Sequence, residues 1–128
     1  MKRSLLIVML ITLGLLFVSM HYTETPTPKP RTWTVQDSKA YAQDTLMAWQ
    51  QNQYKCLVKL WDKESNWRPE AYNKHKVMGK HAGGIPQILG LSPELPAPLQ
   101  IDRGFAYIVH RYGTPCMAWK FHQRKGWY

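Results

Sequence analysis

Apolar residues recur at helical spacing along three stretches of the chain, and these stretches predict its fold. Helices are expected over residues 35–51, 54–64 and 99–112, followed by a last short helix over residues 116–123. The third helix has an apolar stripe at i, i+4, i+7 and i+11 and is followed by Gly113, a typical helix-ending residue. The stripe consists of Ile101, Phe105, Ile108 and Tyr112. No stretch alternates apolar and polar positions convincingly, so we predict a mainly α domain.

The middle of the domain lacks such a pattern. Residues 68–91 are rich in glycine and proline and have no sustained period, so most of this stretch is expected to be loop. Within it, the segment AGGIPQIL is expected to start a short helix or a turn. The proline-spaced segment LSPELPAPLQ then forms a stiff connection to the third helix.

The N-terminal part of the sequence is unlike the rest. A basic start precedes an uncharged apolar run from Ser4 to Met20, which is typical of an export signal. The run ends in a poor cleavage site and is close to the minimum length for a spanning helix. Residues 1–20 are therefore expected to be a signal peptide or a retained signal-anchor. Residues 21–34 form a Pro/Thr-rich linker and residues 35–128 the working domain, which we expect outside the cytoplasm, secreted or membrane-anchored.

The chain is basic, with a formal net charge of +9 at pH 7. A basic exported protein is attracted to polyanions, so anionic wall polymers or a membrane surface are candidate partners. Solubility and nonspecific adhesion explain the same excess equally well. No run of five or more like charges marks a nucleic-acid-binding arm, so we expect no nucleic acid partner. We expect a monomer.

The sequence contains two cysteines, Cys56 and Cys116. In a small exported domain, two distant cysteines predict one disulfide bond. A catalytic cysteine is the alternative, although export disfavours a free thiol. There is no C-x-x-C motif and the five histidines are scattered, so no metal site is expected.

An acidic residue interrupts the apolar face of the second helix. Leu57, Leu60 and Trp61 lie at i, i+3 and i+4, and the i+7 position is Glu64. The helix dipole near the C-terminal end disfavours an anion, and burial beside Trp61 favours the protonated carboxyl group. We therefore expect a raised pKa and a general acid suited to a glycosidic oxygen. The alternative is a glutamate that bends outward at a fraying helix end.

Three segments in order carry a resemblance to a known family. They are CLVKLWDKESNWRPEAYN, AGGIPQIL and QIDRGFAYIVHRYGTPCMAWKFHQRKGWY. Together they resemble the lysozyme-like lytic transglycosylases, which include soluble lytic transglycosylases, goose-type lysozymes and resuscitation-promoting factors. The resemblance is strongest to compact forms from actinobacteria and their phages. It implies a lysozyme-like small helical domain with a glycan cleft.

The resemblance also assigns residues. Glu64 matches the catalytic acid of the family. Substrate-binding positions are implied at Ser65, Trp67, Asn73, Gln87 and Tyr107. Among these, Ser65 is expected to support the adjacent backbone, and Tyr107 to hold its hydroxyl near the acid. Trp67 and Trp119 are expected either to stack on sugar rings or to belong to the core.

The implied substrate is peptidoglycan, cleaved at the β-1,4 bond between N-acetylmuramic acid and N-acetylglucosamine. A lytic transglycosylase would give 1,6-anhydromuramoyl products without a metal or cofactor. The alternatives are a muramidase that hydrolyses the same bond and a non-catalytic wall-binding or assembly module. One departure is the link from residue 74 to residue 83, which is longer than usual in the family and places Lys80 and His81 beside the expected cleft.

Overall fold

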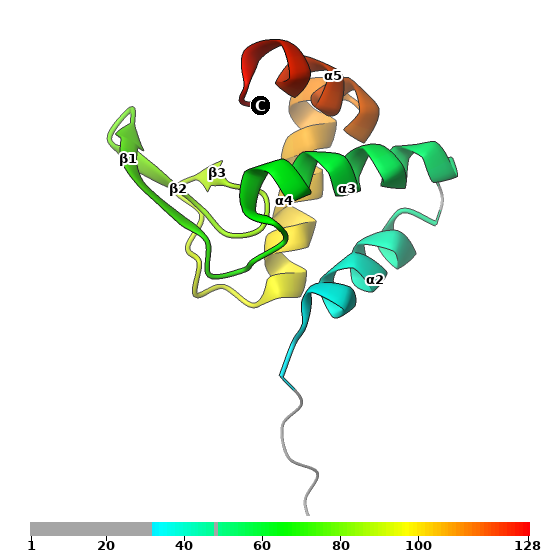
Figure 1. Cartoon of the computed structure of the whole chain (residues 1–128), viewed down its shortest axis with the longest axis horizontal. Coiled ribbons are helices and arrows are strands. Elements are labelled where there is room, and N and C mark those ends of the chain that lie inside the picture. Colours follow the sequence, from blue (N-terminus) through cyan, green and yellow to red (C-terminus); the bar gives the residue numbers. More distant parts are fainter. Residues whose placement is uncertain (1–31, 48) are drawn as a thin grey trace, which may run out of the picture. The chain divides into compact units, whose positions relative to one another are not determined.

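The computed structural model describes residues 32–47 and 49–128 (Figure 1). The predicted signal or anchor and most of the predicted linker lie outside these residues. The helices of the described part are α2 (Val35–Thr45), α3 (Gln51–Ser65), α4 (Ala97–Tyr112) and α5 (Pro115–Lys125). Its strands are β1 (Tyr72–Val77), β2 (Lys80–Gly83) and β3 (Ile88–Leu89). None of the helices described is long and apolar enough to cross a membrane.

The boundary between the first two helices differs from the prediction. The sequence predicts one helix to residue 51, whereas α2 ends at Thr45 and α3 already begins at Gln51. The start of α2 is fixed by a capping box, in which Thr34 and Asp37 bond to each other's backbone amides. Its end has no glycine or proline to mark it. The chain turns there because Leu46 is buried in the core, and tertiary packing overrides the helical propensity of the following residues.

Residues predicted to be loop form a three-stranded antiparallel sheet with the order β1-β2-β3. The prediction without strands was wrong here. Met78 and Gly79 both have positive φ, 51° and 75°, as a tight two-residue hairpin turn requires. Every residue of β1 is exposed, so the strand has no buried face and shows no apolar alternation. The longer link noted in the sequence is this β1–β2 hairpin.

The last two helices confirm their predictions. α4 begins two residues earlier than expected, and Gly113 ends it with φ 80°. Ile101, Phe105 and Ile108 of the predicted stripe are buried. α5 starts at Pro115 after Thr114, whose hydroxyl accepts a hydrogen bond from the amide of Met117.

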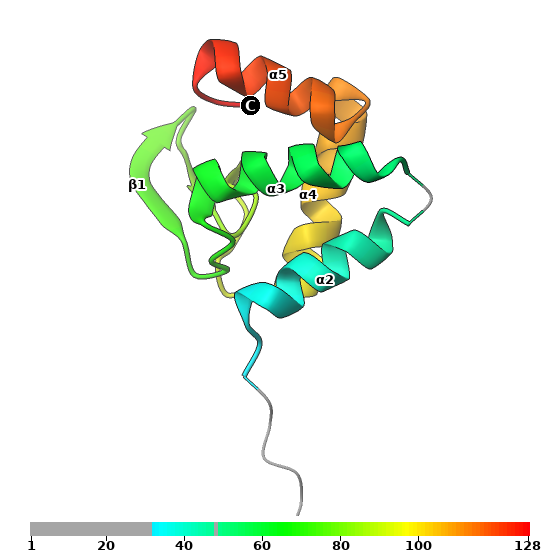
Figure 2. The same cartoon turned by 45° about the vertical axis from the view of Figure 1, so that its right-hand side comes forward.

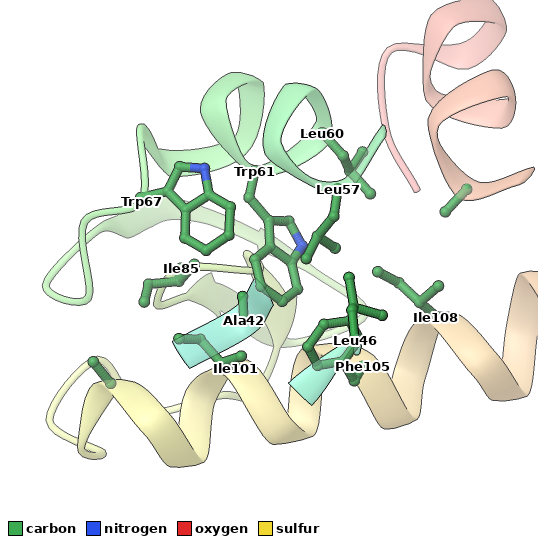
Figure 3. Packing of buried hydrophobic residues seen from close by; sticks show 12 residues of the cluster. Ala42, Leu46, Leu57, Leu60, Trp61, Trp67, Ile85, Ile101, Phe105 and Ile108 are labelled. Carbon is green, nitrogen blue, oxygen red and sulfur yellow. The ribbon is translucent and has the colours of Figure 1, made fainter. Parts of the chain in front are cut away.

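Trp61 lies at the centre of the core, between α3 and α4 (Figure 3). Its ring centroid lies 5.0 Å from that of Trp67 and 5.6 Å from that of Phe105. The indole reaches α4 because Gly104 has no side chain: a Cβ there would lie 2.6 Å from the Trp61 ring. α3 and α4, which correspond to the predicted helices over residues 54–64 and 99–112, thus meet through the apolar faces that the sequence pattern predicted.

The predicted disulfide is confirmed, with Cys56 bonded to Cys116. It joins the early part of α3 to the start of α5. Figures 1 and 2 show these two helices side by side and running in the same direction, with their C-terminal ends on the side of the sheet. The disulfide therefore fixes the position of α5 along α3.

We predict that replacing both cysteines, Cys56→Ala with Cys116→Ala, lowers the free energy of unfolding by roughly 4 kcal/mol, because the bond closes a long loop in the unfolded chain. Chemical denaturation of the oxidised wild type and the double variant measures this difference. Equal denaturation midpoints and slopes for the two proteins would contradict it.

Candidate functional site

Glu64 occupies the last turn of α3, on the same face as the buried Leu57, Leu60 and Trp61. The helix ends at the next residue, Ser65, because Asn66 and Trp67 adopt left-handed backbone conformations with φ 53° and 60°. The Glu64 side chain is only 16% exposed. Burial raises the pKa of its carboxyl group from 4.5 to about 7. The expected direction of this pKa shift is confirmed.

The carboxyl group of Glu64 contacts His122 of α5. Glu64 Oε1 lies 3.0 Å from His122 Nε2, and the histidine side chain is 14% exposed. Burial lowers the pKa of His122, and the positive charge of Lys63 lowers it further. His122 was not among the residues predicted from the sequence to belong to the site. No local pattern could have found it, since the contact depends on how α5 is placed along α3.

The pair of Glu64 and His122 is favoured in its uncharged form. A neutral carboxyl group with a neutral imidazole contains the same number of protons as a carboxylate with an imidazolium. Burial raises the carboxyl pKa and lowers the imidazole pKa, so both shifts leave the proton on Glu64. At 3.0 Å, Glu64 Oε1 and His122 Nε2 are therefore in close polar contact, within a pair whose acidic proton lies on Glu64.

Three tyrosines gather next to this pair. The ring centroid of Tyr128 lies 5.6 Å from that of Tyr107 and 6.0 Å from that of Tyr112. Burial raises the pKa of Tyr112 to about 12 and that of Tyr128 well above its usual value, and the charge of Glu64 adds to both shifts. The hydroxyl of Tyr112 is buried and has no hydrogen-bond partner within the described chain.

The segment after β2 is held in place by side chains rather than by regular structure. Gln100 accepts a hydrogen bond from the amide of Ile85 at 2.8 Å, and Ser65 donates one to the carbonyl of Ile85 at 2.7 Å. The Tyr128 hydroxyl donates to the carbonyl of Pro86 at 2.7 Å and accepts from Trp61 Nε1 at 2.9 Å. These bonds tie the segment to the end of α3 and to the C-terminal residue. Gln100 is fully buried and was missed by the sequence analysis.

The structure corrects two of the predicted substrate-binding residues. Trp67 is fully buried against Trp61, so it belongs to the core and cannot stack on a sugar. Ser65 is also buried, and its hydroxyl is bonded to Ile85. This confirms the expected support of the adjacent backbone but excludes direct contact with a substrate.

The other predicted residues differ in how many of their polar atoms are already engaged in hydrogen bonds within the protein. Gln87 donates both amide protons to backbone carbonyls, of Ala71 at 3.2 Å and Gly84 at 3.0 Å, which leaves only its Oε1 for a ligand. Asn73 is exposed on β1, and its side chain accepts a hydrogen bond from the amide of His75. Tyr107 packs against Tyr112 and Tyr128, with ring centroids 6.3 Å and 5.6 Å away.

An exposed arginine and tryptophan extend the tyrosine cluster. The Arg111 guanidinium lies 5.8 Å from the ring of Tyr107, 5.5 Å from that of Tyr112 and 5.3 Å from that of Trp127. Arg111 also donates to the Tyr107 hydroxyl at 2.8 Å. Trp127 is half exposed, unlike Trp67, and the terminal GWY segment was the available signal for it. A cation and an exposed ring thus lie at the edge of the cluster.

Two other features of the described residues do not add to the site. No group of three histidine, cysteine or acidic side chains there could hold a metal ion. A pocket of about 180 Å³ lies at the turn between α2 and α3, with no acidic or basic side chain in its lining. Its lining residues are Gln43, Leu46, Met47, Trp49, Gln50, Gln51 and Tyr54.

Comparison of the chain with protein-family models, with curated proteins and with solved structures finds no match.

The raised pKa of Glu64 predicts a pH-dependent effect of Glu64→Gln on stability. Because the folded pKa is about 7, against 4.5 for the ordinary group, the folded state loses stability relative to a neutral side chain as pH rises through this window. We expect the variant to be more stable than the wild type at pH 8, by up to about 3 kcal/mol, and equally stable at pH 4. Denaturant unfolding at both pH values measures the difference.

Glu70→Gln is the matched control, because Glu70 is exposed. It should leave stability nearly unchanged at both pH values. A stability difference between Glu64→Gln and the wild type that is the same at pH 4 and pH 8 would contradict the raised pKa.

Proposed function

We propose that this protein cleaves peptidoglycan at the β-1,4 bond between N-acetylmuramic acid and N-acetylglucosamine, as a lytic transglycosylase with Glu64 as its acid. The observation that carries the proposal is the buried carboxyl group with a pKa of about 7 at the end of α3. A group with this pKa is about half protonated at neutral pH and can both donate and accept a proton. The three sequence segments that resemble the lytic transglycosylases indicate peptidoglycan as the substrate.

The absence of a second acidic partner favours transglycosylation over hydrolysis. Burial alone accounts for the raised pKa of Glu64, and no nearby carboxylate contributes within the described chain. Asp62 is bonded to Lys39 at 3.1 Å. Asp102 is bonded to the hydroxyl of Tyr41 at 3.1 Å. A hydrolase of the usual kind needs a second carboxyl group about 5 Å away if retaining, or about 6.5–9.5 Å away if inverting.

In the proposed reaction, Glu64 donates its proton to the bridging oxygen while the bond from that oxygen to muramic C1 breaks. The N-acetyl oxygen of the same sugar stabilises the positive charge at C1. The C6 hydroxyl of that sugar then attacks C1 and returns its proton to Glu64. The product is a 1,6-anhydro ring, and the enzyme recovers its starting protonation state. No water, metal or cofactor enters these steps.

The proposal assigns the fold to the lysozyme-like type, with the glycan in a cleft over the end of α3. The remaining Oε1 of Gln87 is suited to hydrogen bonds with sugar hydroxyl or amide groups. Arg111 is suited to the carboxylates of the peptide or lactyl groups, and Trp127 offers an exposed ring to a sugar face. The protein would act outside the cytoplasm as a monomer.

We predict that Glu64→Gln abolishes glycan cleavage in folded protein, because the variant loses the proton donor, and general acid catalysis is worth roughly 10²–10⁴-fold. Release of soluble fragments from purified peptidoglycan measures the rate. Glu70→Gln serves as the control and should keep wild-type activity. A Glu64→Gln rate within a few-fold of the wild type would rule out Glu64 as the acid.

The products provide a separate prediction. The C6 hydroxyl is held close to C1 by the sugar itself, so its attack has the advantage of an intramolecular reaction. We expect digests to contain mainly 1,6-anhydromuramoyl ends, whose mass is lower by one water, about 18 Da, than that of hydrolysed ends. Mass spectrometry of the digest distinguishes the two. Mainly hydrated reducing ends would make the protein a muramidase with the same acid.

A further inference from the structure

We infer that His122 is a positioning residue for the proposed reaction: its Nε2–H holds Oε1 of Glu64, so that the acidic proton sits on Oε2 and faces the substrate. This inference rests on the proposed function of Glu64 and adds to it a second residue, from a different helix. Nothing in the three sequence motifs assigns a role to this histidine.

The closest polar contact of the carboxyl group is made by one of its two oxygens. His122 Nε2 lies 3.0 Å from Oε1 of Glu64, and both side chains are mostly buried. The imidazole stacks on Trp119 with an interplanar angle of 15° and a centroid distance of 5.6 Å. Stacking and burial restrict rotation of the ring, and the disulfide restricts movement of α5. The contact between His122 and Glu64 is thus held by rigid elements.

The protonation of His122 decides whether the acid can work. A neutral ring with its proton on Nε2 donates to Oε1 and leaves the acidic proton on Oε2. An imidazolium would instead stabilise the carboxylate, so that Glu64 would lose its proton before meeting the substrate. Burial and the positive charge of Lys63 both disfavour the imidazolium. Lys63 therefore protects the acid indirectly, through His122.

The other titratable and charged groups around the pair are consistent with this arrangement. Tyr112 of α4 and the terminal Tyr128 both respond to the charge of Glu64, and both have raised pKa values, so they stay neutral at the working pH. Tyr107 and Arg111 act on Tyr112, and their mutual hydrogen bond directs the arginine to the Tyr107 hydroxyl. Lys63 is the charged group that acts on His122 directly.

In this inference, the hydrogen bond from His122 Nε2 serves both steps of the reaction, the donation of the proton by Glu64 and its return. When Glu64 gives up its proton, the hydrogen bond from Nε2 stabilises the carboxylate that forms. When the C6 hydroxyl returns a proton, it goes to Oε2, because Oε1 is already occupied. The histidine neither gains nor loses a proton in the cycle, which is the difference between positioning and acid–base catalysis.

Two substitutions test this role. His122→Gln keeps an N–H donor near the position of Nε2 but cannot titrate. His122→Phe keeps a ring that can stack on Trp119 but has no donor. His110→Phe is the control, because His110 is exposed on α4. Each variant is compared with the wild type by the pH dependence of kcat and KM on peptidoglycan fragments. The pKa of Glu64 is also measured directly, by ¹³C NMR of glutamate-labelled protein with Glu64→Gln to assign the signal.

We expect His122→Phe to lower kcat by about ten- to a hundredfold with little change in KM, since it removes a hydrogen bond to a group that becomes charged. The pKa of Glu64 should rise further in this variant, because the carboxylate loses its donor. His122→Gln should retain most of the wild-type kcat, and the pKa of Glu64 should not rise further in this variant.

Two outcomes would overturn the inference. One is a His122→Phe variant with the wild-type kcat and the wild-type Glu64 pKa. The other is a His122→Gln variant that matches His122→Phe in both quantities. A wild type that releases no fragments from peptidoglycan at any pH would instead overturn the proposed function and the inference that rests on it, even if the NMR titration still gives a raised Glu64 pKa.

Discussion

The packing of α3 along α5 is the contact on which the candidate site depends. Cys56 and Cys116 join the two helices, and Glu64 and His122 meet roughly two turns further along each of them. A slip of one residue would move either side chain by about 1.5 Å and turn it by about 100°, which is enough to separate the pair. The disulfide is therefore connected to the chemistry of the site through the register of two rigid helices, although it lies away from the reacting atoms.

A buried acid at the end of α3 is unfavourable for the fold, and its surroundings reduce this cost in a specific way. Burial raises the pKa of the carboxyl group to about 7, so the group is neutral below this pH and is not paired with a full charge. The nearby backbone is also satisfied, since Ser65 and Gln100 bond both polar groups of Ile85. What remains unsatisfied is the hydroxyl of Tyr112, next to the acid.

The sequence predicts those parts of the structure that depend on local patterns. The stripe of Ile101, Phe105 and Ile108 defined α4 because a buried helix face has a period that can be read directly. Glu64 was found as an exception to the same kind of pattern. The β1–β2 hairpin was missed because all of β1 faces solvent, so no alternation exists to be seen. His122 was missed for a different reason: 58 positions separate it from Glu64, and only the packing of α3 on α5 brings them together.

The environment of Glu64 also bears on which nucleophile the site favours. A bound water needs two to four polar partners, and it must be oriented toward C1 to act. The groups that surround the acid are mostly aromatic. The tyrosine hydroxyls are largely engaged: that of Tyr128 by Trp61 and Pro86, and that of Tyr107 by Arg111. A hydroxyl that belongs to the substrate needs no such support, because the sugar ring already holds it near C1. In the proposed reaction, the burial that raises the pKa of Glu64 would therefore also favour an intramolecular attack over hydrolysis.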